Sequence, residues 1–307
     1  MWYNKRVEIL CRSHKYRKRI QEEFMDKIRI ITDSGSDIID SKRDNVTVLP
    51  MSIAFGDEVF YDGVTLSHNE FYMKLIESDE LPKTSLIAPA SFADAFEEAK
   101  NAGEKVIAIT ISGGLSGTYQ SAVLAAEDYD DVYVVDSMNV TIGERILVEY
   151  ALKLIDEGKD IEDIVNELES AKKRICVLGL LDTLEYLKKG GRVSSSVAFV
   201  GDVLRIKPVV TVDGEGKVAM LGKARGSKNG NNFLISEIEK VNGVDFDMPY
   251  FLGYTGLNDT LLKKYVKDSE HIWGPYTEEL PVCSIGATIG THVGPNAIAV
   301  AFFAPCK

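Results

Sequence analysis

Short apolar runs typical of buried strands alternate with helical patterns along residues 28–157. The strand-like runs start at Ile28, Val46, Lys105 and Asp131, and helical patterns fill most of the segments after them. Strands that alternate with helices predict a parallel sheet with helices on both faces. We therefore expect the first part of the chain to form a Rossmann-like α/β/α domain.

Polar turns follow three of these runs. Asp33 and Ser34 end the first, residues 112–118 follow the third, and Asp136 and Ser137 end the fourth. In an open parallel sheet, ligands bind beyond the carboxyl ends of the strands. The three turns are thus expected to converge on one rim, where a ligand binds.

The third turn is rich in glycine: residues 111–120 read ISGGLSGTYQ and lead into a helical pattern. Free N–H groups and a partial positive charge make the start of a helix a site for an anion. The stretch is not a P-loop, because no Gly-Lys-Ser/Thr follows. It is not a nucleophile elbow, because Gly117 follows Ser116 directly. A simpler alternative is that Ser116 only caps the helix.

The second half of the chain mixes helices with antiparallel strands. Residues 205–226 have the pattern of a hairpin, and His292 is expected in a tight Gly/Pro turn between two β-rich runs. We predict an N-terminal extension at 1–26, an α/β domain at 27–168, and an α/β domain with a mixed sheet at 169–307.

Composition excludes several classes of protein. The net charge is −12, which argues against broad nucleic-acid binding, and no apolar run reaches the roughly 18 residues of a membrane helix. The cysteines lack CxxC spacing and are expected to be reduced thiols of a cytoplasmic protein. With four histidines and no i, i+4 pair, we expect no metal site. The cysteines are Cys11, Cys176, Cys283 and Cys306.

Residues 1–20 form a basic segment with seven Lys or Arg and one acid. Such an arm can bind a membrane or a nucleic acid. Residues 21–25, QEEFM, can instead be encoded by a purine-rich run just before an ATG, as at a bacterial ribosome-binding site. We therefore expect Met25 to be the natural start.

Two other chemistries stay open at this point. Ser116, His292 and Asp33 have the side chains of a serine hydrolase, whose members need not be neighbours in sequence. The glycine-rich turn also suits a sensor of small anions or nucleotides. Thr84, in the segment LPKTS, and the basic residues Arg192 and Arg225 are each, taken alone, typical of plain loops and solvated surface.

Seven motifs in order resemble the DegV family of bacterial fatty-acid-binding proteins. The motifs occur in the family's order, and the resemblance extends over nearly everything from Ile28 onward. The motifs are ITDSGSDI from Ile31, PKTSLIAP from Pro82, ISGGLSGTYQSA from Ile111, VVDS from Val134, TLEYLKKGGRVS from Thr183, RIKPVVTVDGEG from Arg205 and IGTHVGPNAIAVAF from Ile289.

The resemblance implies a two-domain protein with a tunnel between the domains that holds a long-chain fatty acid of the C16–C18 class and no cofactor. It implies that Thr84 and Ser116 hold the carboxylate, with His292 close by. It further implies a cytoplasmic carrier, not an enzyme, with only transient membrane contact, which presents the acid to a separate fatty acid kinase that docks near Arg225. The expected pocket rim comprises Asp33, Ser34, Ser85, Gly114, Leu115, Gly117, Thr118 and Arg192.

Three residues depart from the family's pattern: Gly35 in the first motif, Arg145 after the fourth and Asn296 in the last. They leave the expected fold unchanged and bear on which acyl chain is preferred and on the partnership with a kinase.

Overall fold

The computed structural model describes residues 27–39, 41–192, 206–275 and 279–306. The expected N-terminal extension at 1–26, with the proposed start at Met25 and with Cys11, lies outside the described residues. So do Val193 and Ser194 of the fifth motif.

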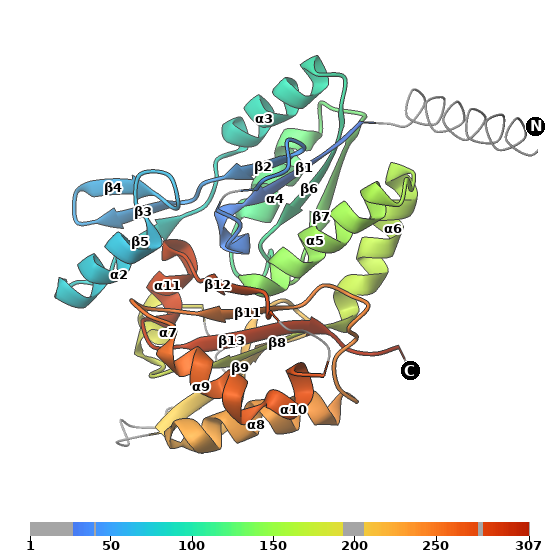
Figure 1. The fold of residues 1–307 in the computed structure, drawn as a ribbon. Coiled ribbons are helices and arrows are strands. Elements are labelled where there is room, and N and C mark those ends of the chain that lie inside the picture. Colours follow the sequence, from blue (N-terminus) through green and yellow to red (C-terminus); the bar gives the residue numbers. More distant parts are fainter. Residues whose placement is uncertain (1–26, 40, 193–205, 276–278, 307) are drawn as a thin grey trace, which may run out of the picture.

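A four-stranded sheet forms the first layer of the molecule, in the order β2-β1-β6-β7, and every pair in it is parallel. Helices cover both of its faces (Figure 1). This confirms the predicted parallel sheet. Its strands are β1 (Ile28–Asp33), β2 (Val46–Leu49), β6 (Lys105–Thr110) and β7 (Val132–Asp136). Its helices are α3 (Pro89–Asn101), α4 (Thr118–Ala126), α5 (Ile142–Asp156) and α6 (Ile161–Ala171).

The side chains of these strands alternate between the two faces, as strand geometry requires. Ile31 and Ala108 pack with α3 and α4, whereas Ile30 and Ile107 pack with α5 and α6. A sheet buried on both faces needs such nearly continuous apolar strands.

A small antiparallel sheet projects from this layer. It comprises β3 (Ser52–Phe55), β4 (Glu58–Tyr61) and β5 (Lys83–Ser85), in the order β4-β3-β5. Helix α2 (His68–Glu77) follows the hairpin, and a capping box of Ser67 and Glu70 begins this helix. Ile53, Phe71 and Ala287 share its core, so this part packs against the C-terminal half of the chain.

A six-stranded mixed sheet forms the second layer, in the order β10-β9-β8-β13-β11-β12. All pairs are antiparallel except β11 with β12. The predicted hairpin at 205–226 is the pair β9 and β10. The strands are β8 (Ile175–Leu180), β9 (Ile206–Val212), β10 (Val218–Arg225), β11 (Phe251–Tyr254), β12 (Val282–Ser284) and β13 (Ile298–Phe303).

Helices α8 to α10 cover the outer face of this sheet, while its inner face meets the first layer (Figure 1). Two short helices lie beside its end, and two 3-10 turns complete the described elements. The helices are α7 (Glu185–Gly190), α8 (Gly226–Lys240), α9 (Thr260–Asp268), α10 (Glu270–Trp273) and α11 (Ala287–Val293), and the turns are η1 (Ser34–Ser36) and η2 (Lys172–Arg174).

The two layers share one apolar core. Phe92 of α3, Ile146 of α5, Val177 of β8 and Phe303 of β13 belong to the same cluster of buried side chains. Because burial of apolar surface drives this packing, the layers are held face to face. A cavity in this shared core is therefore enclosed by both halves of the chain.

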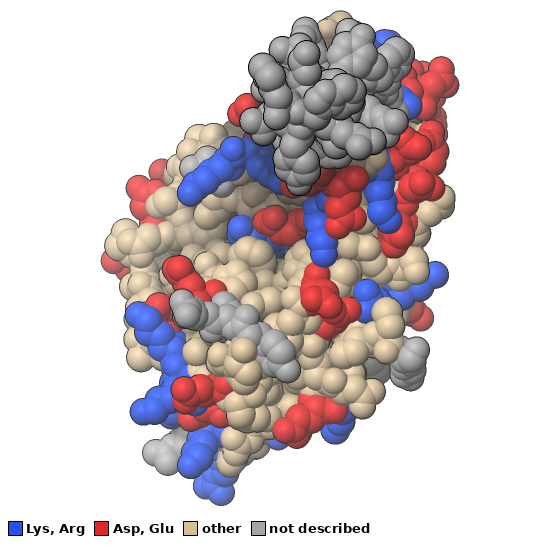
Figure 2. Space-filling view, turned by 45° about the vertical axis from the view of Figure 1, so that its right-hand side comes forward, with Lys and Arg blue, Asp and Glu red and all other residues tan. Residues whose placement is uncertain are grey.

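The surface carries charges of both signs. On the face shown in Figure 2, acidic and basic side chains of the described residues are interspersed, and no continuous basic stripe crosses that face. None of the described helices combines the length and apolarity that a membrane span requires.

Candidate functional site

A cavity of about 440 Å³ lies between the two sheets. Aliphatic side chains from both layers make up most of its lining. The polar lining residues are Thr84, Ser85, Ser116, Thr141, Arg192, Thr211, Thr255, Thr288 and His292. The aliphatic ones include Met51, Leu86, Ile111, Leu115, Val140, Val177, Leu181, Leu187, Val210, Val212, Val218, Ile285, Ile289, Val293, Ala297 and Ala299.

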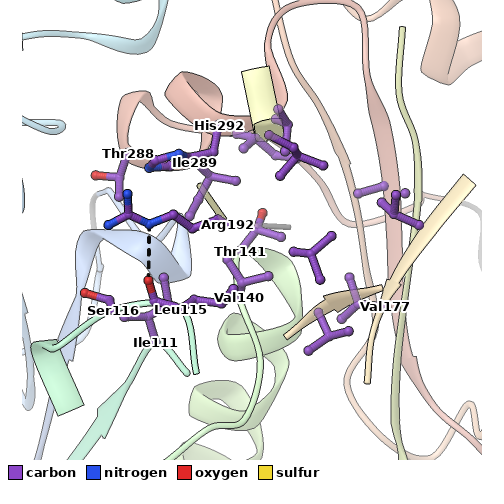
Figure 3. Close-up of a pocket in the computed structure, with 18 of the residues that line it drawn as sticks. Ile111, Leu115, Ser116, Val140, Thr141, Val177, Arg192, Thr288, Ile289 and His292 are labelled. Atoms are coloured by element: carbon purple, nitrogen blue, oxygen red, sulfur yellow. Dashed lines mark hydrogen bonds between the residues drawn. The ribbon is translucent and has the colours of Figure 1, made fainter. Parts of the chain in front are cut away.

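The lining is polar at one end and apolar at the other. Figure 3 shows Ser116, Arg192 and His292 gathered on one side, and Val177 on the opposite side, with Val140 in between. The cavity thus suits an amphipathic ligand, whose head group needs hydrogen bonds and whose tail needs none.

At the polar end, Thr84 of β5 meets His292 of α11. Thr84 Oγ1 lies 3.0 Å from His292 Nε2. Burial, and then the charge of Arg192, lower the pKa of His292 to about 4, so the imidazole is neutral at physiological pH. The expectation that His292 lies in a tight turn is wrong, because it lies on a short helix that ends at Val293.

Gly190 explains the close packing around this histidine. A methyl group built on Gly190 would lie 2.3 Å from His292 Nδ1, which has no hydrogen-bond partner among the described residues. The glycine pair that ends α7 therefore has two roles. Gly191 supplies the left-handed C-cap at φ 69°, and Gly190 leaves room for the imidazole.

Ser116 lies opposite, just before α4. Its Oγ accepts a hydrogen bond from Thr118 N at 3.3 Å and lies 2.9 Å from Thr118 Oγ1. The N-cap of α4 is Gly117, which has no side chain that could cap the helix. Ser116 thus bonds one free amide of the helix start while also lining the cavity.

Arg192 closes the polar end on one side. Its Nη1 donates to Gly190 O at 2.7 Å. Its Nε donates to Leu115 O at 3.4 Å, which is the dashed bond in Figure 3. These bonds tie the end of α7 to the glycine-rich turn. The side chain is exposed, so its charge is partly screened by water.

The expected rim residues fall into two groups. Ser85, Leu115, Gly117 and Arg192 line the cavity. The other four, Asp33, Ser34, Gly114 and Thr118, belong to the same turns but not to the lining.

Each of these four has another contact. Asp33 accepts hydrogen bonds from Gly35 N and Ile111 N, and Ser34 Oγ accepts one from Met51 N. Gly114 lies against the backbone of Glu215 and Gly216, and Thr118 Oγ1 accepts a hydrogen bond from Ile87 N. The turns converge as expected, but these four residues support the backbone around the cavity and do not line it.

Two carboxylates that sequence reasoning missed fix the helix that carries His292. Asp62 accepts hydrogen bonds from Ala287 N at 3.0 Å and Thr288 N at 2.9 Å, and Asp37 accepts one from Gly286 N at 2.7 Å. Both acids come from the first layer. A carboxylate at a helix start bonds free amides and complements the helix dipole, so Asp62 and Asp37 place α11 relative to Thr84. No local sequence signal marks Asp62 for this role.

Buried acids lie behind the rim. Burial raises the pKa of Asp33 and of Asp37 to about 7, and raises that of Glu144 well above its usual range. Glu144 Oε1 accepts a hydrogen bond from Thr32 Oγ1 at 3.1 Å. Among the described residues, no group of three His, Cys, Asp or Glu is arranged to hold a metal ion.

Ser116, His292 and Asp33 are not linked as a catalytic triad. The imidazole Nε2 is bonded to Thr84, and the Asp33 carboxylate is occupied by two backbone amides. A triad needs the base bonded to the nucleophile and the acid bonded to the base. In this conformation, the three residues do not form the arrangement of a serine hydrolase.

Fold and site together define a class: α/β proteins with two sheets and, between them, a mostly apolar cavity with hydroxyl and imidazole groups at one end. The family model described as "Uncharacterised protein, DegV family" matches residues 27–305. A DegV domain-containing protein of Caldanaerobacter subterraneus is 33% identical over 287 residues, which cover 91% of this chain and 99% of that protein. The chain belongs to the DegV family.

Solved structures extend the comparison. A DegV family protein from Thermus thermophilus, described by its fatty acid binding, matches with a TM-score of 0.82 and 31% identity, over 91% of this chain and 100% of that one. The fatty acid kinase B3 protein of Streptococcus pneumoniae, loaded with linoleic acid, matches with a TM-score of 0.80 and 25% identity, over 91% and 100%. Structural neighbours of this chain thus bind fatty acids.

Proposed function

We propose that this protein binds one long-chain fatty acid of the C16–C18 class, with its carboxylate at Thr84 and Ser116 and its tail in the apolar end of the cavity. The observation that supports this most is the polarity of the cavity, in which Ser116, Arg192 and His292 gather at one end and the rest of the lining is mostly aliphatic. The fatty acids bound by neighbouring structures support the same ligand.

The energetics suit such a guest. Burial of the roughly 15 carbons of a C16 tail contributes about 12 kcal/mol before the costs of association. The head group is expensive to dehydrate and needs several donors. Hydroxyls of Thr84 and Ser116 can supply them without a fully buried positive charge.

His292 has a supporting role in this proposal. Because it is neutral, its Nε2–H can donate to Thr84 Oγ1, which leaves the hydroxyl proton of Thr84 free to point at the carboxylate. The opposite tautomer would use that hydroxyl proton for the imidazole. We therefore propose the Nε2–H tautomer, in which the neutral His292 orients Thr84 as a donor and adds no charge.

The protein is proposed to act as a carrier without chemistry of its own, and to present the acid to a separate fatty acid kinase. Arg225 is the residue proposed to face that kinase. It is exposed at the end of β10, outside the cavity lining, so it is available to a partner without touching the lipid. The similarity to the fatty acid kinase B3 protein supports this partnership. The free thiols Cys176, Cys283 and Cys306 fit the proposed cytoplasmic location, with only transient membrane contact to exchange lipid.

The binding proposal is tested by titrating delipidated protein with palmitate or oleate. Ser116→Ala is expected to weaken binding by about 1–3 kcal/mol, because a buried carboxylate loses a donor. Ser121→Ala is the matched control, since Ser121 is a buried serine of α4, the helix that follows Ser116, and does not line the cavity. Equal affinity of both variants would mean that Ser116 only supports the start of α4. Binding of inorganic phosphate in place of either acid would favour the anion-sensor alternative.

A further inference from the structure

The apolar end of the cavity is closed by a contact between the two layers. Val177 lies on the inner face of β8 and is 6% exposed. A methyl group built on Gly143 of α5 would lie 2.2 Å from Val177 Cγ2, so the valine is seated directly on the glycine backbone. Beyond it, Val177 shares the packed core with Ile146 and Ala301.

Along β8, the next residue that faces the cavity toward the polar end is a glycine and not a valine. Val177 and Gly179 lie two residues apart on the same face of β8, and Leu181 follows directly after the strand; all three line the cavity. Gly179 has no side chain, and a methyl group there would lie 3.0 Å from Val210 Cγ2 across the strand pair. Gly179 therefore presents only backbone to the cavity and leaves room for Val210, whereas Val177 presents a side chain.

The contact of Val177 with Gly143 lies at the end of the cavity away from the polar groups. Figure 3 places Val177 on the side of the cavity opposite Ser116 and Arg192. A guest whose head is held at Ser116 extends toward Val177. The last methyl group of its tail thus meets the side chain of Val177, backed by α5.

We infer that Val177 and Gly143 together set the upper limit of acyl-chain length in this protein. The inference rests on the proposed fatty-acid function and adds its specificity determinant. A methyl group removed from position 177 deepens the cavity. A methyl group added at position 143 pushes Val177 inward and shortens it. The two positions are coupled, because their side chains compete for one volume.

The test uses delipidated full-length protein and a series of saturated fatty acids. In the wild type, affinity is expected to rise about fourfold per added methylene until the tail reaches Val177, and then to stop rising. Val177→Ala is expected to move that break to acids roughly one or two carbons longer, since each buried methylene needs its own space. Gly143→Ala is expected to move it in the opposite direction.

The double variant Gly143→Ala/Val177→Ala gives the sharpest result. The added methyl group refills part of the space left by the two methyl groups of the valine, so the break is expected to move from that of Val177→Ala back toward that of the wild type. Val209→Ala is the matched control: Val209 is a fully buried valine of the neighbouring strand, in the core on the other face of the sheet. It is expected to lower stability without moving the break.

Folding is checked by thermal denaturation of every variant. Should Gly143→Ala fail to fold, Val177→Leu takes its place, because it shortens the cavity from the β8 side. An unchanged break in folded Val177→Ala and in either shortening variant overturns the inference, and leaves the proposed function intact. Loss of fatty-acid binding by the wild type would instead defeat the proposed function itself.

Discussion

Thr84 Oγ1 and His292 Nε2 lie 3.0 Å apart, although 208 residues separate them in sequence. Thr84 comes from the small sheet of the first layer, and His292 from the helix that Asp62 and Asp37 hold in place. The bond therefore forms only when the two halves of the chain are correctly docked. It joins the assembly of the fold to the proposed head-group site.

Removal of this imidazole is expected to weaken fatty-acid binding without loss of the fold. His292→Ala frees Thr84 to rotate, which should cost about 1–2 kcal/mol of binding free energy. Titration of the delipidated variant with palmitate measures this. His271→Ala, at an exposed position on α10, is the control and should bind as the wild type does. An unaffected His292→Ala would mean that Thr84 needs no orienting partner.

Gly190→Ala is expected to displace the His292 imidazole and so to disturb the same site. The new methyl group collides with His292 Nδ1, and the adjustment should cost about 1–3 kcal/mol of stability and weaken binding as well. Denaturant unfolding and palmitate titration read the two effects. Gly214→Ala offers a comparison, since a methyl group there meets nothing within 4 Å. Wild-type behaviour of Gly190→Ala would contradict the packing described.

The buried carboxyl of Asp33 predicts a dependence of stability on pH. Its pKa is about 7 in the folded protein against an ordinary value of 3.8, chiefly through burial, with a smaller contribution from the charge of Asp62. Between these values the folded state binds more protons than the unfolded state, so stability falls as the pH rises toward 7.

Asp33→Asn cannot ionise and should lack this contribution. The unfolding free energy of the wild type relative to the variant is therefore expected to drop by an amount on the order of 2–4 kcal/mol between pH 4 and pH 8. Urea titrations at both pH values measure the drop. Asp160→Asn, at an exposed position, is the control for the substitution itself. A constant difference across this range would show that Asp33 stays ionised when buried.

Arg225→Ala is expected to leave palmitate affinity unchanged and to weaken association with a fatty acid kinase. The reason is its position at the end of β10, away from the cavity. Lys223→Ala removes a nearby exposed charge on the same strand and should have a smaller effect. Loss of lipid binding in Arg225→Ala would contradict its assignment to the partner surface.

Local patterns predicted the parts of this molecule that are determined locally. The strands at Ile28 and Lys105 are continuous apolar runs with a polar turn after each, and the order of such elements constrains the sheet. The resemblance to the DegV family supplied the pairing of Thr84 with Ser116, which no single motif contains. Both of these residues line the cavity.

The features that the sequence did not reveal are contacts that form only when the two layers dock. His292 was expected in a tight turn because Gly290, Gly294 and Pro295 flank it. The structure instead has a helix there, packed so closely against Tyr72 that a methyl group built on Gly290 would lie 2.6 Å from the Tyr72 hydroxyl. The bonds from Asp62 to α11 span 225 residues or more, and the contact of Val177 with Gly143 joins different layers. No spacing along the chain predicts such contacts.

Native mass spectrometry of protein purified from bacterial cells tests the central claim most directly. The account predicts a single bound mass of about 250–290 Da, that of the C16–C18 acids whose buried tails supply the affinity. Solvent extraction should release it as a fatty acid, and the delipidated protein should take up added palmitate. Protein that is repeatedly recovered empty, and that stays empty when palmitate is added, would contradict the account.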